Sequence, residues 1–302
     1  MWEKKGLIFK ISKPKKWMQT HTALPFADNI RNEIFRIYFS TRDKENRASI
    51  GYLELDLEKN KILRVSQKPI LRHGKVGTFD EKGVMGSCIV NYKKKKYLYY
   101  TGWSSSKSTP FDWSIGLAIS DDNGKTFEKI SEGPIISKNK YDPIFVGSPT
   151  VIFEKNSWKM WYISSKGWEK RGNSLNAPYF LKYATSKNGI DWKMNDNIAI
   201  NIKKNEKGLG RSSVIKENGK YKMWYSFASN QYKIGYAESK NGIDWVRKDN
   251  KAGIKTSKNG WDSKSIEYPF IFNYKKNRIM LYNGNEYGKT GFGYALFKNS
   301  NR

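Results

Sequence analysis

The sequence contains the same seven residues twice, and this repeat constrains the fold more than any other feature. Ser-Lys-Asn-Gly-Ile-Asp-Trp stands at 186–192 and again at 239–245, 53 residues further along. A looser copy, one residue longer, occupies 120–127. Each copy follows an apolar run with a small residue in its middle, and Asn-Gly supplies the positive φ angles of a tight β-hairpin. The repeat therefore predicts a strand, a turn and a second strand that opens on an aromatic residue.

Similar units follow one another along the whole chain. Each has an apolar first strand, a second strand that ends in aromatic residues, and a third strand with a small residue. Equivalent tyrosines at 100, 162, 225 and 282 are spaced by 62, 63 and 57 residues. Second strands are expected at 34–39, 96–100, 158–162, 221–225 and 278–282, and third strands at 49–55, 115–120, 181–186, 234–239 and 291–297. Antiparallel units of this size, repeated five times, predict a radial β-propeller.

The N-terminal segment completes this prediction. The fifth unit ends just after its third strand, whereas residues 2–11 read as a strand that precedes the first unit. We expect residues 2–11 to supply the outer strand of the last blade. The fold class is then an all-β, five-bladed propeller whose ring is closed by the N-terminal strand, with residues 1–302 forming one domain.

The charge of the chain limits its partners. The 56 Lys and Arg against 28 Asp and Glu give a formal net charge of +28, which could attract nucleic acid, anionic lipid or an acidic substrate. The lysines are scattered singly through turns and strand edges, where they oppose sheet-to-sheet aggregation. We therefore do not expect a nucleic-acid partner.

Three features of the sequence bear on where we expect the protein to be located: its apolar runs, its first residues and its cysteine content. No apolar run reaches the ~18 residues of a membrane span, and the first residues lack the apolar core of a secretory signal. Cys88 is the sole cysteine, so an intrachain disulfide is excluded. A reducing compartment, and hence a cytoplasmic location, is the simple expectation.

Several motifs carry a resemblance to a known group of enzymes. The Asn-Gly-Ile-Asp-Trp hairpins, and the first-strand motifs at 147–149 and 267–269, resemble those of five-bladed glycoside hydrolases of the arabinanase/levansucrase type. The likeness spans essentially the whole chain. Segments 83–88, 147–149, 261–263 and 282–293 are most similar to uncharacterised members associated with bacterial surface-polysaccharide synthesis. The resemblance implies an enzyme that cleaves a glycosidic or sugar-phosphate bond in an anionic or nucleotide-linked sugar.

The resemblance also implies a catalytic acid. Such hydrolases use one protonated carboxyl to assist the leaving oxygen and one ionised carboxylate as base or nucleophile. Glu267 fits the acid pattern, two residues before Pro269, although it lies in the fifth unit and not where the family usually puts its acid. On the other first strands no Asp precedes a Pro. A non-catalytic sugar-binding propeller, or an interaction scaffold that uses the basic surface, therefore stays open as an alternative.

Three aspartates are candidates for the second carboxylate. Asp80, Asp142 and Asp262 each follow an aromatic residue at the same distance before the first-strand motif, and Asp142 and Asp80 are preferred. A feature repeated in three units is more often architectural, because Asp side chains cap turns by accepting backbone N–H groups.

Further residues are candidates for substrate binding. Arg211 suits a phosphate or carboxylate, or pairs structurally with Glu267. His21 could act as a base or donor, or be a core histidine. Trp faces stack on sugars. The complete substrate-binding set is His21, Arg211, Ser148, Trp103, Trp168, Asn285 and Glu286. No HExxH motif, cysteine pair or phosphate loop is present, so neither a metal nor a cofactor is expected.

Overall fold

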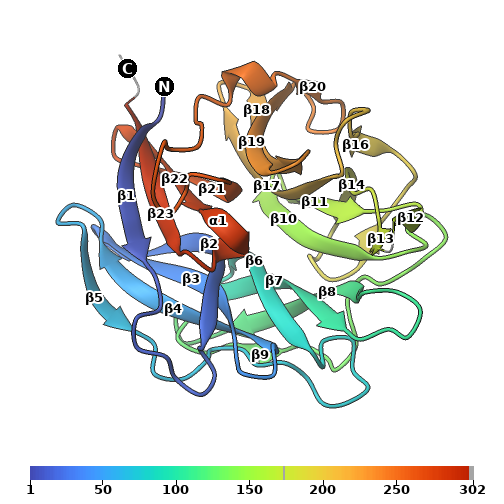
Figure 1. Ribbon diagram of the computed structural model, residues 1–302, viewed down its shortest axis with the longest axis horizontal. Helices are drawn as coiled ribbons and strands as arrows, with labels where there is room; N and C mark the ends of the chain where they lie inside the picture. Colours follow the sequence, from blue (N-terminus) through green and yellow to red (C-terminus); the bar gives the residue numbers. More distant parts are fainter. Residues whose placement is uncertain (173, 299–302) are drawn as a thin grey trace.

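The computed structural model describes residues 1–172 and 174–298, and it is almost entirely β-sheet (Figure 1). Its helical parts are the single turn α1 (Asn285–Gly288) and the 3-10 turn η1 (Asp249–Lys251). No helix in these residues is long and apolar enough to cross a membrane.

The strands form antiparallel groups in chain order. The first two groups are β2 (Thr20–Arg31), β3 (Ile34–Arg42), β4 (Ala48–Asp56) and β5 (Lys61–Val65), then β6 (Gly83–Tyr92), β7 (Lys95–Ser104), β8 (Asp112–Ser120) and β9 (Glu128–Lys129). A single parallel pair, Ala48 with Gly83, joins these two groups into one eight-stranded sheet. The next groups are β10 (Val146–Glu154), β11 (Ser157–Ser164), β14 (Phe180–Ser186), β15 (Trp192–Lys193) and β16 (Ile198–Ile200), then β17 (Gly208–Glu217), β18 (Lys220–Ala228), β19 (Tyr232–Ser239) and β20 (Val246–Arg247).

The last sheet combines the two ends of the chain. It runs β1 (Glu3–Phe9), β23 (Phe292–Lys298), β22 (Asn277–Asn283) and β21 (Glu267–Tyr274). The predicted pairing of residues 2–11 with the last unit is confirmed, because β1 pairs antiparallel with β23. Trp2 anchors this strand: it is buried, and its ring meets Trp224 and Phe297 at centroid distances of 6.0 and 5.5 Å. All predicted second and third strands are also present.

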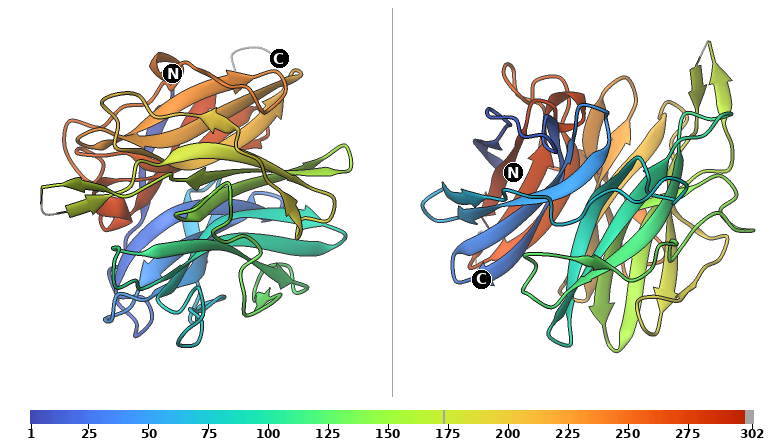
Figure 2. Two further views of the ribbon diagram at one scale, coloured as in Figure 1. Left: turned by 90° about the vertical axis from the view of Figure 1, so that its right-hand side faces the viewer. Right: turned by 90° about the horizontal axis from the view of Figure 1, so that it is seen from below.

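The first strand of each group lies toward the centre of the molecule (Figure 1). β2 contacts β6, β6 contacts β10, β10 contacts β17, β17 contacts β21, and β21 contacts β2. Large aromatic side chains fill the space between neighbouring sheets. Trp158 on β11, for example, is fully buried and meets Tyr99 on β7 with ring centroids 6.4 Å apart. A short hairpin, β12 (Glu169–Arg171) with β13 (Ser174–Asn176), projects beyond the sheets (Figure 2).

The repeated Asn-Gly segments differ from the predicted tight hairpins. Gly189 and Gly242 have positive φ angles of 78° and 80°, whereas Asn188 and Asn241 do not. Ser186 pairs with Trp192, so a five-residue loop separates the two strands. Side chains hold this longer loop: Ser186 Oγ accepts from the N–H of Gly189, and Asn188 Oδ1 accepts from two N–H groups further on. The asparagine therefore serves as a hydrogen-bonding cap and not as a residue of positive φ.

These loops also connect neighbouring sheets. The carbonyl of the loop glycine accepts a hydrogen bond from an aromatic side chain on the second strand of the preceding group. The donors are the Tyr38 hydroxyl to Gly124 at 3.0 Å, the Tyr99 hydroxyl to Gly189 at 2.8 Å and the Trp161 indole to Gly242 at 2.8 Å. The repeat is thus a hydrogen-bonded lock between adjacent groups.

Candidate functional site

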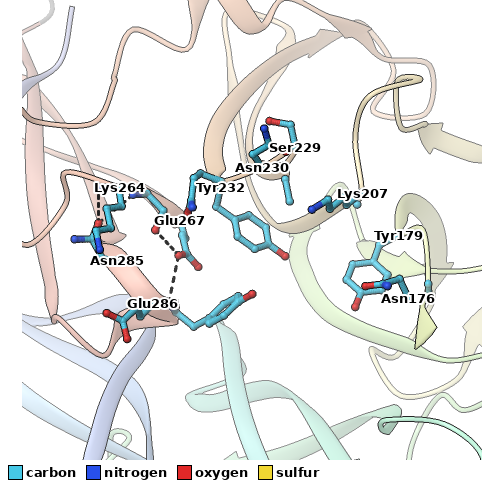
Figure 3. A pocket seen from close by; sticks show the side chains of 16 residues that line it. Asn176, Tyr179, Lys207, Ser229, Asn230, Tyr232, Lys264, Glu267, Asn285 and Glu286 are labelled. Atoms are coloured by element: carbon cyan, nitrogen blue, oxygen red, sulfur yellow. Dashed lines mark hydrogen bonds between the residues drawn. The ribbon is translucent and has the colours of Figure 1, made fainter. Parts of the chain in front are cut away.

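A polar pocket of about 530 Å³ opens between the sheets that contain β17 and β21 (Figure 3). Glu267 and Ser265 line it from the start of β21, and Tyr232 lines it from β19. The remaining lining residues include Asn176, Tyr179, Lys207, Lys264, Asn285, Glu286 and Tyr287. The pocket therefore combines one buried carboxyl with tyrosines and lysines.

Glu267 is placed by a bulge at the start of β21. The register with β22 shifts between Glu267 and Phe270, and Tyr268 has a positive φ of 52°. Bulges of this kind re-aim side chains and are frequent beside active sites. The Glu267 side chain is only 2% exposed although it lines the pocket.

In the described residues, only one of the two Glu267 carboxyl oxygens has hydrogen-bond partners. Its Oε1 accepts from the Ser265 hydroxyl at 2.7 Å and from the Tyr287 N–H at 3.3 Å. Its Oε2 is buried and has no hydrogen-bond partner among the described residues. Burial raises the pKa of Glu267 to about 7, so a substantial fraction of the carboxyl carries a proton near neutral pH. A protonated Oε2 can donate a hydrogen bond or a proton to a ligand oxygen.

The turn α1 supports this carboxyl. Glu286 and Tyr287 both have left-handed backbone angles, with φ of 58° and 56°, which is a strained arrangement for residues with side chains. It brings the Tyr287 N–H to Glu267. Asn285 lines the pocket, and its Oδ1 accepts from the N–H groups of Lys264 and Ser265 at 2.8 and 3.0 Å; its predicted role in substrate binding stays a prediction. Asn285 thereby positions the serine that holds Glu267.

Tyrosine rings form much of the wall around Glu267. Tyr232 lies 6.0 Å from Tyr268 and 5.9 Å from Tyr287 between ring centroids, and Tyr179 lines the pocket further along. Burial raises the pKa of Tyr179 to about 12, so its hydroxyl stays protonated at neutral pH. None of these tyrosines was predicted as a site residue. Tyr268 and Tyr287 stood inside the quoted motifs 267–269 and 282–293. Tyr179 and Tyr232 each stand seven residues before a copy of the seven-residue repeat, and this shared spacing is the signal that could have found them.

The charges in the pocket favour an anion. Lys207 and Lys264 line it, and neither forms an ion pair among the described residues. Glu286, the other acidic residue of the lining, is exposed and lies 3.4 Å from the Lys289 ammonium group. With Glu267 partly protonated, the cations of the pocket outnumber its free anions.

The three aspartates predicted as a set share one environment away from the pocket. Each is buried, accepts from the hydroxyl of a second-strand tyrosine and pairs with a lysine, and none lines the pocket. The groups are Asp80 with Tyr100 (3.2 Å) and Lys129 (2.5 Å), Asp142 with Tyr162 (3.0 Å) and Lys182 (2.9 Å), and Asp262 with Tyr282 (3.0 Å) and Lys4 (2.6 Å). These contacts support the architectural interpretation. Catalytic roles for Asp80 and Asp142 stay predictions.

Three further candidates lie outside the lining of the pocket. His21 is half-buried, and burial together with Arg42 and Lys289 lowers its pKa to about 4, which leaves it neutral at pH 7. Ser148 has a positive φ of 47° at a first-strand bulge, and its N–H donates to Thr101 Oγ1 at 2.7 Å. Arg211 does not pair with Glu267, because its Nη2 donates to two backbone carbonyls.

The two candidate tryptophans pack against protein. Trp168 meets Phe111 and Phe145 at centroid distances of 5.1 and 5.9 Å, and Phe145 in turn meets Tyr179 at 5.4 Å. Trp168 thus belongs to an aromatic cluster that supports one wall of the pocket. Trp103 lies against Gly83, whose missing side chain leaves room for the indole. In the described part of the chain, no group of three His, Cys, Asp or Glu side chains could hold a metal ion.

The arrangement of sheets is that of a β-propeller, and solved structures of the same fold are glycoside hydrolases. A structure named "Glycoside hydrolase" has a TM-score of 0.78 at 15% identity and covers 99% of this chain and 92% of its own. A thermostable family-43 glycoside hydrolase has a TM-score of 0.71 at 13% identity, with 97% and 94% covered. The endo-arabinase from Bacteroides thetaiotaomicron VPI-5482 has a TM-score of 0.65 at 11% identity, with 95% and 99% covered. At these identities the likeness concerns the fold.

The sequence itself places the chain among closer relatives. None of the known protein-family models matches it. It is 38% identical over 300 residues to the uncharacterized proteins MT1551 and Rv1502 of Mycobacterium tuberculosis, from strains CDC 1551 / Oshkosh and ATCC 25618 / H37Rv, and 99% of each chain is covered. The chain therefore belongs to the family of MT1551 and Rv1502.

Proposed function

We propose that the pocket binds a carbohydrate and that Glu267 donates a proton to the oxygen of a glycosidic or sugar-phosphate bond. The observation that carries this proposal is the buried Oε2 of Glu267, which has no partner in the described residues and belongs to a carboxyl whose pKa is about 7. A general acid needs a retained proton on an oxygen that the protein itself does not engage. The glycoside hydrolases that share the fold support the same chemistry.

The lining of the pocket supports a sugar as the ligand. Tyrosine rings offer an apolar face for the C–H groups of a pyranose or furanose ring and a hydroxyl at their edge. Lys207 and Lys264 add positive charge, and neither forms an ion pair with a carboxylate among the described residues. This supports an acidic or nucleotide-linked sugar, and we place the reaction in surface-polysaccharide metabolism on the resemblance described above.

A second candidate function is sugar binding without turnover. Hydrolysis also needs an ionised carboxylate about 5–10 Å from the acid. Glu286 is the other acid of the lining, and it lies on the exposed turn α1 beside Lys289. Asp80 and Asp142 are each occupied by a tyrosine and a lysine. This shortage of a second free carboxylate favours the binding alternative.

We further propose that the strand groups are the blades of a five-bladed propeller formed by the whole chain. The circular succession of contacts among β2, β6, β10, β17 and β21 supports this arrangement. In it, β1 completes the last blade and closes the ring.

A screen of acidic oligosaccharides and nucleotide sugars tests the proposed function. Wild type and the variants Glu267→Gln and Glu286→Gln would be compared by calorimetry for binding and by product analysis for turnover. We expect Glu267→Gln to bind the same sugar but to turn it over about 10²- to 10⁴-fold more slowly, because the amide cannot donate the proton. Binding with no turnover by any of the proteins would favour the second candidate, and turnover unchanged in Glu267→Gln would exclude Glu267 as the acid.

A further inference from the structure

Arg211 lies where three strand groups meet at the centre of the molecule. It belongs to β17, at a bulge where the register with β18 shifts between Leu209 and Ser212. Its Nη2 donates to the carbonyl of Pro25 on β2 at 2.8 Å and to that of Tyr268 on β21 at 2.5 Å. The guanidinium therefore reaches across the centre, from one first strand to two others.

Within residues 1–172 and 174–298, no carboxylate pairs with Arg211. The side chain is fully buried, and its Nε and Nη1 have no acceptor among the described residues. Cys88 and Tyr268 are the ionisable groups that act on it electrostatically, and burial raises the pKa of both, so both are neutral at pH 7. Burial lowers the pKa of Arg211 to about 9, which still leaves the guanidinium mainly protonated at pH 7. A buried charge in this state is strongly disfavoured unless an anion compensates it.

The other two buried arginines of the described residues each pair with a carboxylate. Arg36 pairs with Glu54 at 2.7 Å, and Arg278 pairs with Glu217 at 2.7 Å. Both carboxylates come from strands of the same or the adjacent sheet. Among the buried arginines of the described residues, Arg211 is the exception. Its acceptors are backbone carbonyls, whereas the other two each pair with a carboxylate.

A further unused donor lies on β6, the first strand that contacts β2 and β10. Ser87 stands at the bulge of β6 between Gly86 and Cys88, it is buried, and its hydroxyl has no partner among the described residues. Among the described residues, the guanidinium thus keeps three N–H groups without an acceptor, one on Nε and two on Nη1, and the Ser87 hydroxyl on β6 is also unpaired. Small anions are bound by donors of this kind.

We propose that Arg211 binds a small inorganic anion, chloride in particular, at the centre of the sheets. The complete burial of the guanidinium excludes a sugar or nucleotide as the occupant, and a monoatomic anion needs only N–H and O–H donors. The site is separate from the sugar pocket, since Arg211 does not line that pocket. The anion neutralises the buried cation and so stabilises the junction of β2, β17 and β21.

Thermal unfolding at constant ionic strength tests this proposal. Sodium chloride would replace sodium isethionate stepwise, because isethionate is much larger than chloride and is not a sugar. For wild type we expect a saturable rise in Tm, on the order of 3 °C for each tenfold increase of chloride above its Kd. We expect Arg211→Met to have the same Tm in both salts, and Arg72→Met, which removes an exposed arginine, to keep the wild-type response.

A second measurement decides the matter if Arg211→Met fails to fold. Crystals of the wild-type protein soaked in sodium bromide should show an anomalous peak within hydrogen-bonding distance of Arg211 Nε and Nη1. Equal Tm values of the wild type in chloride and isethionate, or bromide peaks elsewhere with none at Arg211, would overturn the proposal. No sugar is present in either experiment, so these results are independent of the proposed function.

Discussion

Glu267 holds its proton to a higher pH in the folded protein than in the unfolded chain. Its pKa rises from an ordinary 4.5 to about 7, mainly because the carboxyl is buried. Between these pH values the folded state keeps a proton that the unfolded state has lost, so unfolding releases it. The free energy of unfolding therefore falls as the pH rises through this window, by about 3 kcal/mol in total for a shift of this size.

Glu267→Gln should remove this part of the pH dependence. Urea unfolding of both proteins at pH 4.5 and pH 8 measures it, and we expect the variant to gain on wild type by about 3 kcal/mol over that interval. A parallel pH profile for the two proteins would show that the carboxyl is ionised in the folded state throughout. In that case Glu267 could not serve as a proton donor at neutral pH.

Individual residues of the site were only partly predictable. Glu267 was found because it precedes a proline in a repeated frame, and Asn285 and Glu286 because they lie in a glycine-rich segment. The wall around Glu267 was not found, although Tyr179 and Tyr232 stand 53 residues apart, each seven residues before a copy of the seven-residue repeat, because this spacing does not show that their rings face the pocket. Arg211 was recognised as central, but the sequence could not indicate that its partners are backbone carbonyls.

Among the elements of the fold, three second strands are held by a tyrosine–aspartate–lysine cluster. In each cluster the tyrosine of the second strand bonds to an aspartate in the chain segment that precedes the first strand of the same group. Asp142 is fully buried, and so is Lys182, which lies 2.9 Å away. Asp142→Ala leaves this lysine uncompensated, so we expect a loss of about 3–5 kcal/mol in the free energy of unfolding. Asp196 also approaches Lys182, at 3.9 Å, but its side chain is 66% exposed, so Asp196→Ala should have little effect. Denaturant unfolding of the two variants separates these cases.

A third variant, Asp142→Asn, bears on the predicted catalytic role of Asp142. Loss of turnover in a well-folded Asp142→Asn protein, with its free energy of unfolding close to wild type, would argue for chemistry at this residue. A loss of activity that only parallels the loss of stability would argue for architecture.

The loops of the seven-residue repeat form hydrogen bonds to strands of the preceding group. Tyr99 on β7 donates to the carbonyl of Gly189 at 2.8 Å, and both groups are buried. Tyr99→Phe should lower the free energy of unfolding by about 1–3 kcal/mol, because it leaves a buried carbonyl unpaired. Tyr97→Phe on the same strand is the matched control, since no hydrogen bond holds its hydroxyl among the described residues. Equal stability of the two variants in denaturant unfolding would show that the loop is not a lock.

At the scale of the whole molecule, the strands and their order could be predicted from the sequence, whereas the shape and lining of the pocket could not. Strand order follows from the period of the repeat and from the aromatic ends of the second strands, which are properties of the sequence itself. The pocket depends on bulges and on the strained turn at 286–287, where long-range contacts override local preference. Such contacts leave no periodic signal in the chain.

The pairing of β1 with β23 makes the stability of the molecule depend on its first residues. Trp2 donates from its indole to the Ala252 carbonyl at 3.0 Å, and Lys4 pairs with the buried Asp262 at 2.6 Å. Deleting residues 1–11 removes both contacts and exposes the edge of β23. Each loss costs about 3–5 kcal/mol, which together approach the stability of an ordinary domain. We expect a truncated protein that is largely unfolded or self-associated at 25 °C, as measured by circular dichroism and size-exclusion chromatography.

A permuted chain separates the loss of this strand from the loss of a particular terminus. Glu3 pairs with Leu296 and Phe9 with Phe292, so the start of β1 lies beside the end of β23. Residues 1–11 attached to the C-terminus through a flexible Gly/Ser linker can therefore enter the sheet in the native direction, as an antiparallel hairpin. We expect this permuted protein to recover the cooperative unfolding of the wild type, and the same construction with Trp2→Ala to recover it only in part. Recovery by neither protein would mean that β1 stabilises the molecule through its chain connection to β2 and not through its pairing with β23.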